Sequence, residues 1–73
     1  METDLVIRTH SEGSQLTITL GGELDVSNAS ALRSLLASVD GSIRQVTLDV
    51  SALEFIDSTG VGVVAEAHRN FGP

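Results

Sequence analysis

The stretch LDVSALEFIDSTGVGVV, residues 48–64, joins a strand-like run to the cluster Asp57-Ser58-Thr59 and then to two glycines at the start of a valine-rich segment. A serine that follows an aspartate and precedes an apolar segment is typical of a helix N-cap. Its hydroxyl oxygen can accept an otherwise unpaired backbone N–H of the first turn. Two other roles stay open for Ser58: it attacks a substrate, or another protein modifies it. From these residues alone, the cap is the favoured interpretation.

A catalytic Ser58 would need a general base within hydrogen-bond reach. His68 lies roughly 15 Å further along the same predicted helix, at 1.5 Å per residue, and nothing in the sequence brings His10 close. The serine also lacks a surrounding G-x-S-x-G motif. We therefore do not expect an enzyme, and we interpret His68 as the half-buried polar end of a helix stripe.

The glycines Gly60 and Gly62 open a segment, GVGVVA, that formally matches the dinucleotide-binding pattern G-x-G-x-x-G/A. That pattern belongs directly after a strand, whereas the strand predicted here, residues 44–50, ends some nine residues earlier. The Gly-Lys-Ser/Thr of a phosphate-binding loop is also missing. We expect no cofactor and no metal. Without side chains at these glycines, however, another group could approach the first helical turn closely.

Alternation of apolar and polar residues predicts strands over residues 5–9 and 15–20, joined by a turn near Gly13 and therefore antiparallel. Helical spacing predicts a helix over residues 28–39 and a second helix over residues 58–70. The strand at 44–50 is reached through a helix, so it should run parallel to the strand before it. The predicted fold class is α/β, a mixed sheet with helices packed on it.

The ends and faces of the two helices can also be predicted. For the first helix, Ser27 or Asn28 is placed to cap the start, and Gly41 stands where a left-handed residue would end it. The second helix is a poor one by propensity, because it contains valines and two glycines. Its apolar stripe is predicted to contain Val61, Val64, Ala65 and His68.

Composition narrows the range of partners. The 73 residues suffice for one small domain, and ten acids against four arginines give a net charge of −6, which disfavours nucleic acid and anionic membrane surfaces. Without cysteine there is no disulfide framework and no thiolate metal site. No apolar run approaches the roughly 18 residues of a membrane span, and the N-terminus is acidic rather than signal-like. We expect a soluble, cytoplasmic protein.

Two segments together resemble a known family. LDVSALEFIDSTGVGVV is similar to the signature of STAS domains of the anti-sigma factor antagonist type, in which an Asp-Ser-Ser/Thr-Gly turn opens a helix. GGELDVSNASALR, residues 21–33, resembles the earlier segment of the same family, with Asp25 matching its acid before the first helix. The two motifs have the order and spacing of the family and cover most of the chain.

The resemblance implies a bacterial regulator that is phosphorylated at Ser58 by its partner, an anti-sigma factor that is also a serine kinase. Unphosphorylated, such a protein captures the anti-sigma factor and frees the sigma factor; a PP2C-type phosphatase reverses the modification. The implied partner-binding residues are Asp25, Asp57, Ser58, Thr59, Gly60 and Val61. Thr59 is a second hydroxyl that keeps the acceptor assignment open.

Two points qualify the resemblance. The family domain runs to roughly a hundred residues, so residues 1–73 are expected to form a single STAS domain that lacks the last strand and helix, and the exposed sheet edge could form a homodimer. The alternative function is a STAS subunit of a stress-signalling scaffold or of a lipid-transport ATP-binding cassette complex.

Overall fold

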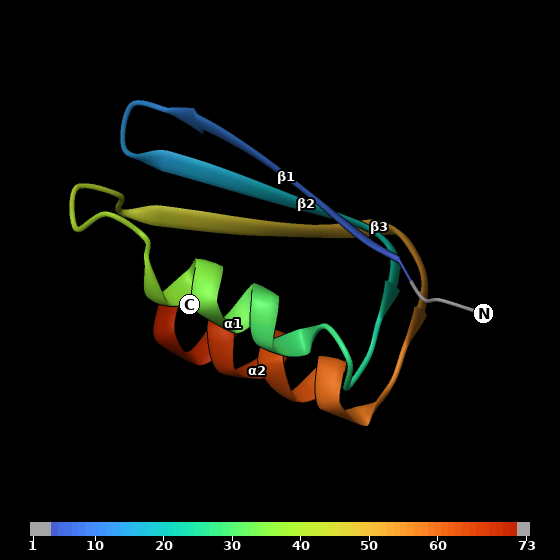
Figure 1. Ribbon diagram of the computed structural model, residues 1–73. Coiled ribbons are helices and arrows are strands. Elements are labelled where there is room, and N and C mark those ends of the chain that lie inside the picture. The colour runs from blue at the N-terminus through green and yellow to red at the C-terminus, as the bar shows by residue number, and fades with distance from the viewer. Residues whose placement is uncertain (1–3, 72–73) are drawn as a thin grey trace.

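The structure is a computed structural model that describes residues 4–71. Its elements follow the predicted order and are β1 (Leu5–Glu12), β2 (Gln15–Leu24), α1 (Ala29–Ala37), β3 (Gln45–Ile56) and α2 (Ser58–Phe71). The strands form one sheet in the order β1-β2-β3, and both helices lie side by side against one face of it (Figure 1). The predicted α/β fold with a mixed sheet is therefore confirmed.

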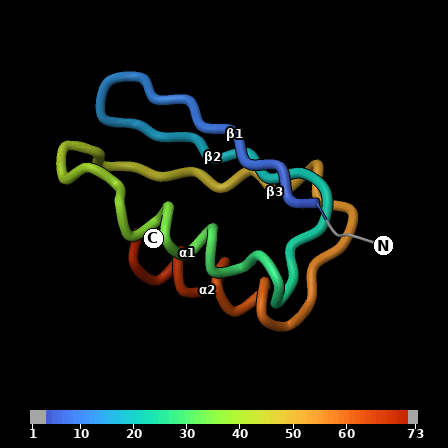
Figure 2. The backbone as a smooth tube through the Cα atoms, viewed as in Figure 1, coloured from blue at the N-terminus to red at the C-terminus, as the bar shows by residue number. Residues whose placement is uncertain are grey.

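Strand directions also agree with the prediction. β1 and β2 pair antiparallel through a tight turn at Gly13 and Ser14, and Gly13 has the positive φ of +62° that such a turn favours. β2 and β3 pair parallel, and α1 forms the crossover between them. The backbone trace in Figure 2 shows the hairpin tip and the loop before β3 at one end of the sheet, and both turns into helices at the other end.

All three strands are longer than predicted, and β3 extends to Ile56 rather than residue 50. Its twelve residues lie opposite the ten of β2, because the register shifts twice between the two strands. At the first shift the Ser51 hydroxyl and backbone N–H donate to Asp49 Oδ1, at 2.7 and 3.0 Å. These hydrogen bonds lower the pKa of Asp49. The shifts are bulges that interrupt the period-2 pattern and bend the strand.

Gly22 allows β2 to bend in the same region. Its φ is +84°, and a Cβ at this position would collide with the carbonyl oxygen of Asp4. The backbone N–H of Glu23 donates to that same carbonyl at 3.0 Å. The glycine thus permits β2 to lie close to the backbone of Asp4. Beyond this point both β2 and β3 turn toward the helices (Figure 1).

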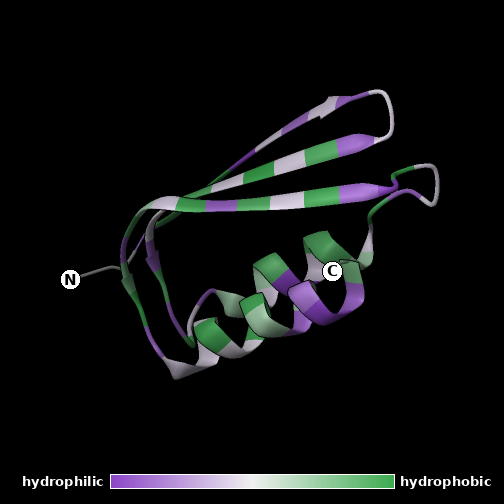
Figure 3. Cartoon of the chain, turned by 180° about the vertical axis from the view of Figure 1, so that it is seen from behind, coloured by the Kyte–Doolittle hydropathy of each residue, from purple (hydrophilic) through white to green (hydrophobic). Residues whose placement is uncertain are grey.

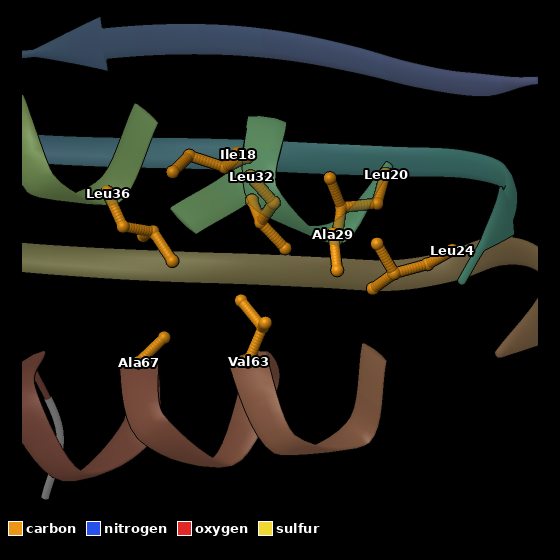
Figure 4. Close-up of a cluster of buried hydrophobic side chains, with 8 residues drawn as sticks. All are labelled: Ile18, Leu20, Leu24, Ala29, Leu32, Leu36, Val63 and Ala67. Carbon is orange, nitrogen blue, oxygen red and sulfur yellow. The ribbon is translucent and has the colours of Figure 1, made fainter. Parts of the chain in front are cut away.

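The core lies between the sheet and the helices. The strands carry alternating hydrophobic and hydrophilic residues (Figure 3). The buried hydrophobic side chains are Ile18, Leu20, Leu24, Ala29, Leu32, Leu36, Val63 and Ala67. Those from α2, Val63 and Ala67, point toward the side chains of β2 and α1 (Figure 4). The central strand β2 therefore supplies the sheet's buried residues, as the alternation of Leu16, Ile18 and Leu20 predicted, although Leu16 is only partly buried.

The predicted ends of α1 need correction. Asn28 occupies the N-cap position, but its side chain makes no cap bond there; instead it accepts from the Asp25 N–H and donates to the Glu23 carbonyl. The C-terminal end of α1 is satisfied by Ser38. Its hydroxyl and its backbone N–H both donate hydrogen bonds to the Leu35 carbonyl, three residues earlier. Within residues 4–71 only Gly13 and Gly22 have positive φ, so Gly41 is not a left-handed terminator.

The predicted stripe of α2 is only partly confirmed. Val64 is partly buried and packs against the core, but Val61 is 51% exposed and His68 is exposed rather than half-buried. The buried residues of this helix are Gly60, Val63 and Ala67. Both stripes have helical spacing, and the observed one was hidden because glycine and alanine give a weak apolar signal. Small residues at this face let α2 lie close to β2 and α1. No helix in the described part of the chain is long and apolar enough to span a membrane.

Candidate functional site

Two loops that are far apart in the sequence meet where β2 and β3 end. The first loop leads from Leu24 into α1 and the second leads from Ile56 into α2, and they lie side by side in Figure 1. The Asp57 N–H donates to the Leu24 carbonyl at 3.1 Å, which continues the strand pairing between Leu24 and Ile56. Parallel strands end at the same edge of a sheet, so this geometry brings the two family-like segments together.

Asp57 is the centre of this site. Its Oδ1 accepts the Gly60 N–H at 2.9 Å, and its carbonyl accepts the Val61 N–H at 2.9 Å. Its Oδ2 accepts the Val26 N–H of the other loop at 3.0 Å. Asp57 therefore caps α2 and fastens the first loop to it. The prediction that Ser58 is the cap is wrong, because an aspartate one residue earlier fits the same requirement equally well.

Ser58 is the first residue of α2 and is exposed. Among residues 4–71 its hydroxyl has no hydrogen-bond partner, in contrast to the hydroxyls of Ser27, Ser38 and Ser51. Neighbouring Thr59 is partly buried. Because Asp57 satisfies the end of the helix, the Ser58 oxygen is left facing solvent at a helix N-terminus, where the free N–H groups and the helix dipole favour negative charge.

Asp25 fixes the first loop. Its Oδ1 accepts both the N–H and the hydroxyl of Ser27, at 2.9 and 2.6 Å. Its carbonyl accepts the N–H groups of Asn28 and Ala29, at 3.1 and 2.8 Å. The N–H of the next residue, Val26, donates to Asp57 Oδ2, so one hydrogen bond links the loop of Asp25 to Asp57.

Gly60 has a different role from the one predicted. It is buried, and a Cβ there would lie 2.8 Å from Leu24 Cγ and from Ile56 Cγ1, and 3.0 Å from the Leu24 carbonyl oxygen. The close approach at this glycine is thus to the protein's own strands. The other glycine of α2, Gly62, has open space around it, because a Cβ there would meet nothing within 4 Å.

Strand β3 ends immediately before Asp57, so the spacing used to reject a dinucleotide site was wrong. The rejection itself stands on a different observation: both glycines lie inside α2 rather than in a turn that precedes it. Within residues 4–71 no group of three or more histidine or acidic side chains is arranged to hold a metal ion. The arrangement offers instead an exposed serine, Ser58, directly after the hydrogen-bonded carboxylate of Asp57.

Sequence reasoning missed Val26. This side chain is 73% exposed in the first loop, next to Asp57. The sequence does show that Val26 is an aliphatic residue between the polar Asp25 and Ser27. It belongs neither to the alternating pattern of the preceding strand nor to the apolar stripe of the following helix.

Solved structures with related sequences share this fold. An anti-sigma factor antagonist from Mycobacterium paratuberculosis is 26% identical, with a TM-score of 0.81 over 94% of this chain and 60% of that one. The antagonist SpoIIAA in its unphosphorylated form is 25% identical, with a TM-score of 0.76 over 90% of this chain and 63% of that one. The Bacillus cell fate determinant SpoIIAA in its phosphorylated form is 25% identical, with a TM-score of 0.76 over 90% of this chain and 62% of that one.

This chain therefore spans less than two thirds of the length of those proteins. A search of curated proteins found no significant match. A family model described as "Mlab, STAS domain" matches residues 7–72, which include both loops of the site. The chain belongs to the STAS domain family.

Proposed function

We propose that this protein is an anti-sigma factor antagonist whose switch is phosphorylation of Ser58. Unphosphorylated, it binds an anti-sigma factor that is also a serine kinase, and the sigma factor is released. A PP2C-type phosphatase restores the binding form. The observation that carries the proposal is the exposed Ser58 hydroxyl, which has no partner among the described residues and begins a helix already capped by Asp57.

In the proposed reaction the Ser58 oxygen attacks the γ-phosphorus of ATP bound to the kinase. The new oxygen–phosphorus bond forms as the bond between the β- and γ-phosphates breaks, and ADP leaves. A base of the kinase takes the hydroxyl proton, since Asp57 is committed to two backbone N–H groups. The protein is the substrate of this reaction rather than its catalyst, and it would act in the bacterial cytoplasm.

The fold should tolerate the modification. A phosphate adds about −1.5 to −2 charges, and at a helix N-terminus the dipole and free N–H groups stabilise that charge. Docking should be affected instead. The phosphate would stand beside the carboxylate of Asp57 and close to the loop of Asp25, so a partner that covers this surface would have to bury a crowded negative charge.

The proposed partner-binding surface comprises Asp25, Asp57, Ser58, Thr59 and Val61. Gly60 is left out of the predicted set, because it packs against the protein's own strands. The similarity to antagonists solved in unphosphorylated and phosphorylated forms supports this proposal. The exposed edge of β3, which pairs with β2 alone among the described strands, supports self-association as a secondary property.

A second candidate is a STAS subunit of a stress-signalling scaffold or of a lipid-transport ATP-binding cassette complex. The observation in its favour is that the matching family model is named Mlab rather than after an antagonist. In this role the chain would bind the other subunits of the complex and would need no kinase partner. Phosphorylation of Ser58 by an anti-sigma factor kinase therefore separates the two candidates.

The test measures affinity for the anti-sigma factor kinases of the source organism, purified one at a time. Ser58→Ala should remain bound in the presence of ATP, because it cannot accept phosphate. Ser58→Asp should bind at least about tenfold more weakly, a change of about 1.4 kcal/mol. Equal affinity of Ser58→Asp and the wild type at low salt would contradict a charge-based switch.

A further inference from the structure

Val26 is the most exposed large apolar side chain among residues 4–71, at 73%. Single exposed aliphatic residues are ordinary on protein surfaces. Val26, however, is held in place by a bonded loop. Its own N–H donates to Asp57, and the residues on both sides of it are joined through the Asp25 carboxylate.

The loop around Val26 has little freedom. Its Asn28 side chain accepts the Asp25 N–H and donates to the Glu23 carbonyl, each at 2.9 Å. The Ser27 N–H and hydroxyl both donate to Asp25 Oδ1. An exposed apolar side chain on a rigid loop contributes nothing to the core, but it can bind a partner without the entropy loss of ordering a flexible segment.

A second exposed valine belongs to the same unit. Val61 is 51% exposed, and its N–H donates to the Asp57 carbonyl, while the N–H of Val26 donates to the Asp57 side chain. Both valines are therefore attached to the residue that precedes Ser58. Gly62, beside Val61, leaves open space on that side of α2.

We propose that Val26 and Val61 form an apolar anchor that flanks Ser58 and inserts into the docking face of the kinase partner. This inference rests on the proposed function, and adds Val26 as a specificity-determining residue of the same site. Interfaces draw most of their affinity from a few apolar side chains that become desolvated near the centre of the contact. The two valines are suited to that role because both are exposed and both are hydrogen-bonded through their backbone N–H groups to Asp57, the residue that precedes Ser58.

The charges around the anchor indicate the chemistry of the partner. Asp25 and Asp57 lie beside the valines, the exposed Glu54 is three residues before Asp57, and the whole chain carries a net charge of −6. A complementary surface would present an apolar recess bordered by arginine or lysine. A phosphate on Ser58 would then be carried into the apolar centre of the contact, where it would lose its hydration.

The experiment measures affinities of Val26→Thr, Val61→Thr and Ser58→Asp for the individually purified anti-sigma factor kinases of the source organism. Threonine keeps the branched shape of valine and adds a hydroxyl, so it tests apolar contact rather than volume. The matched control is Val6→Thr, which is similarly exposed at 47%. Val6 lies in β1, where it pairs with Gly21. Its neighbours Leu5 and Ile7 pack against the core, so the side chain of Val6 lies on the face of the sheet away from the helices.

Val26→Thr and Val61→Thr should each weaken binding by about tenfold, the loss expected when a buried valine gains a polar group, and Val6→Thr should not. All three should melt like the wild type by circular dichroism. Wild-type affinity for Val26→Thr, together with weak binding of Ser58→Asp, would overturn the anchor and leave the proposed function standing. If the wild type binds none of the kinases, the proposed function fails, and the anchor with it.

Discussion

At the residue scale, the site suits a switch because the Asp57 side chain makes hydrogen bonds that hold the structure and the Ser58 side chain makes none within residues 4–71. The carboxylate of Asp57 satisfies the Gly60 N–H of the helix and the Val26 N–H of the neighbouring loop. The hydroxyl of Ser58 is exposed and has no partner in the described part of the chain. A modification at Ser58 can therefore change the surface without removing a bond that holds the fold.

Stability measurements on these two residues should separate the roles. Asp57→Ala removes a cap and the bond between the loops, and should cost about 2 kcal/mol. Ser58→Ala should stay within about 0.5 kcal/mol of the wild type, since it removes no intramolecular hydrogen bond. Urea unfolding followed by circular dichroism suits a chain without Trp or Tyr. Similar losses for the two variants would mean that Ser58 shares the cap.

The two glycines of α2 offer a matched pair. Gly60→Ala should destabilise the protein by about 1–3 kcal/mol, because its Cβ would lie 2.8 Å from Leu24 Cγ and 3.0 Å from the Leu24 carbonyl oxygen. Gly62→Ala should stabilise it by up to about 1 kcal/mol through helix propensity, since its Cβ would meet nothing. Thermal unfolding compares the two directly. A stabilising Gly60→Ala would show that α2 can shift away from Leu24 at little cost.

These residues show how far the sequence could define the site. The segments around Asp25 and Ser58 could be identified because their motifs are local. The burial of Gly60 could not, because it depends on Leu24, which is distant in sequence and is brought close only by the pairing of β2 with β3. The cap was ambiguous because Asp57 and Ser58 are adjacent and both suit an N-cap; only the starting residue of the helix decides between them.

At the element scale, the bends of β2 and β3 bring the two loops together. Alternation predicted β3 only to residue 50, since the bulge after Asp49 changes the phase of the pattern before the strand resumes. The element order and strand directions could be predicted because they follow from periodicity and connection length. The bulges could not, because pairing across the sheet determines them.

The bend in β2 should be sensitive to Gly22. Gly22→Ala combines a positive φ with a collision against the Asp4 carbonyl and should destabilise the protein by about 2 kcal/mol or more. Gly13→Ala is the control, because its φ is also positive but a Cβ there meets nothing, so its cost should be about 1 kcal/mol. Denaturant midpoints measure both. Equal losses would mean that the contact with Asp4 adds nothing beyond backbone strain.

At the scale of the whole molecule, the outer edge of β3 is the feature most prone to association. Within residues 4–71 it has no strand beside it, and Val50, Phe55 and Ile56 are exposed along it. We expect light scattering, referenced to refractive index, to give a mass above the monomeric 7.6 kDa at tens of micromolar.

Val50→Lys should reduce that association, because a charge on an exposed strand edge disfavours pairing with another strand. A monomeric mass for the wild type, together with a cooperative melt, would contradict the expectation and show that the edge is protected by its own bulges and charges.

The central claim is that Ser58 is the phosphorylated switch of an anti-sigma factor antagonist. It is tested most directly by incubating the protein with ATP and each purified anti-sigma factor kinase of the source organism, and mapping the modified residue by peptide mass spectrometry. We predict a single phosphate on Ser58, none on Ser58→Ala, and unchanged modification of Thr59→Val. Phosphate on Thr59 alone, or no phosphate with any of these kinases, would contradict the claim.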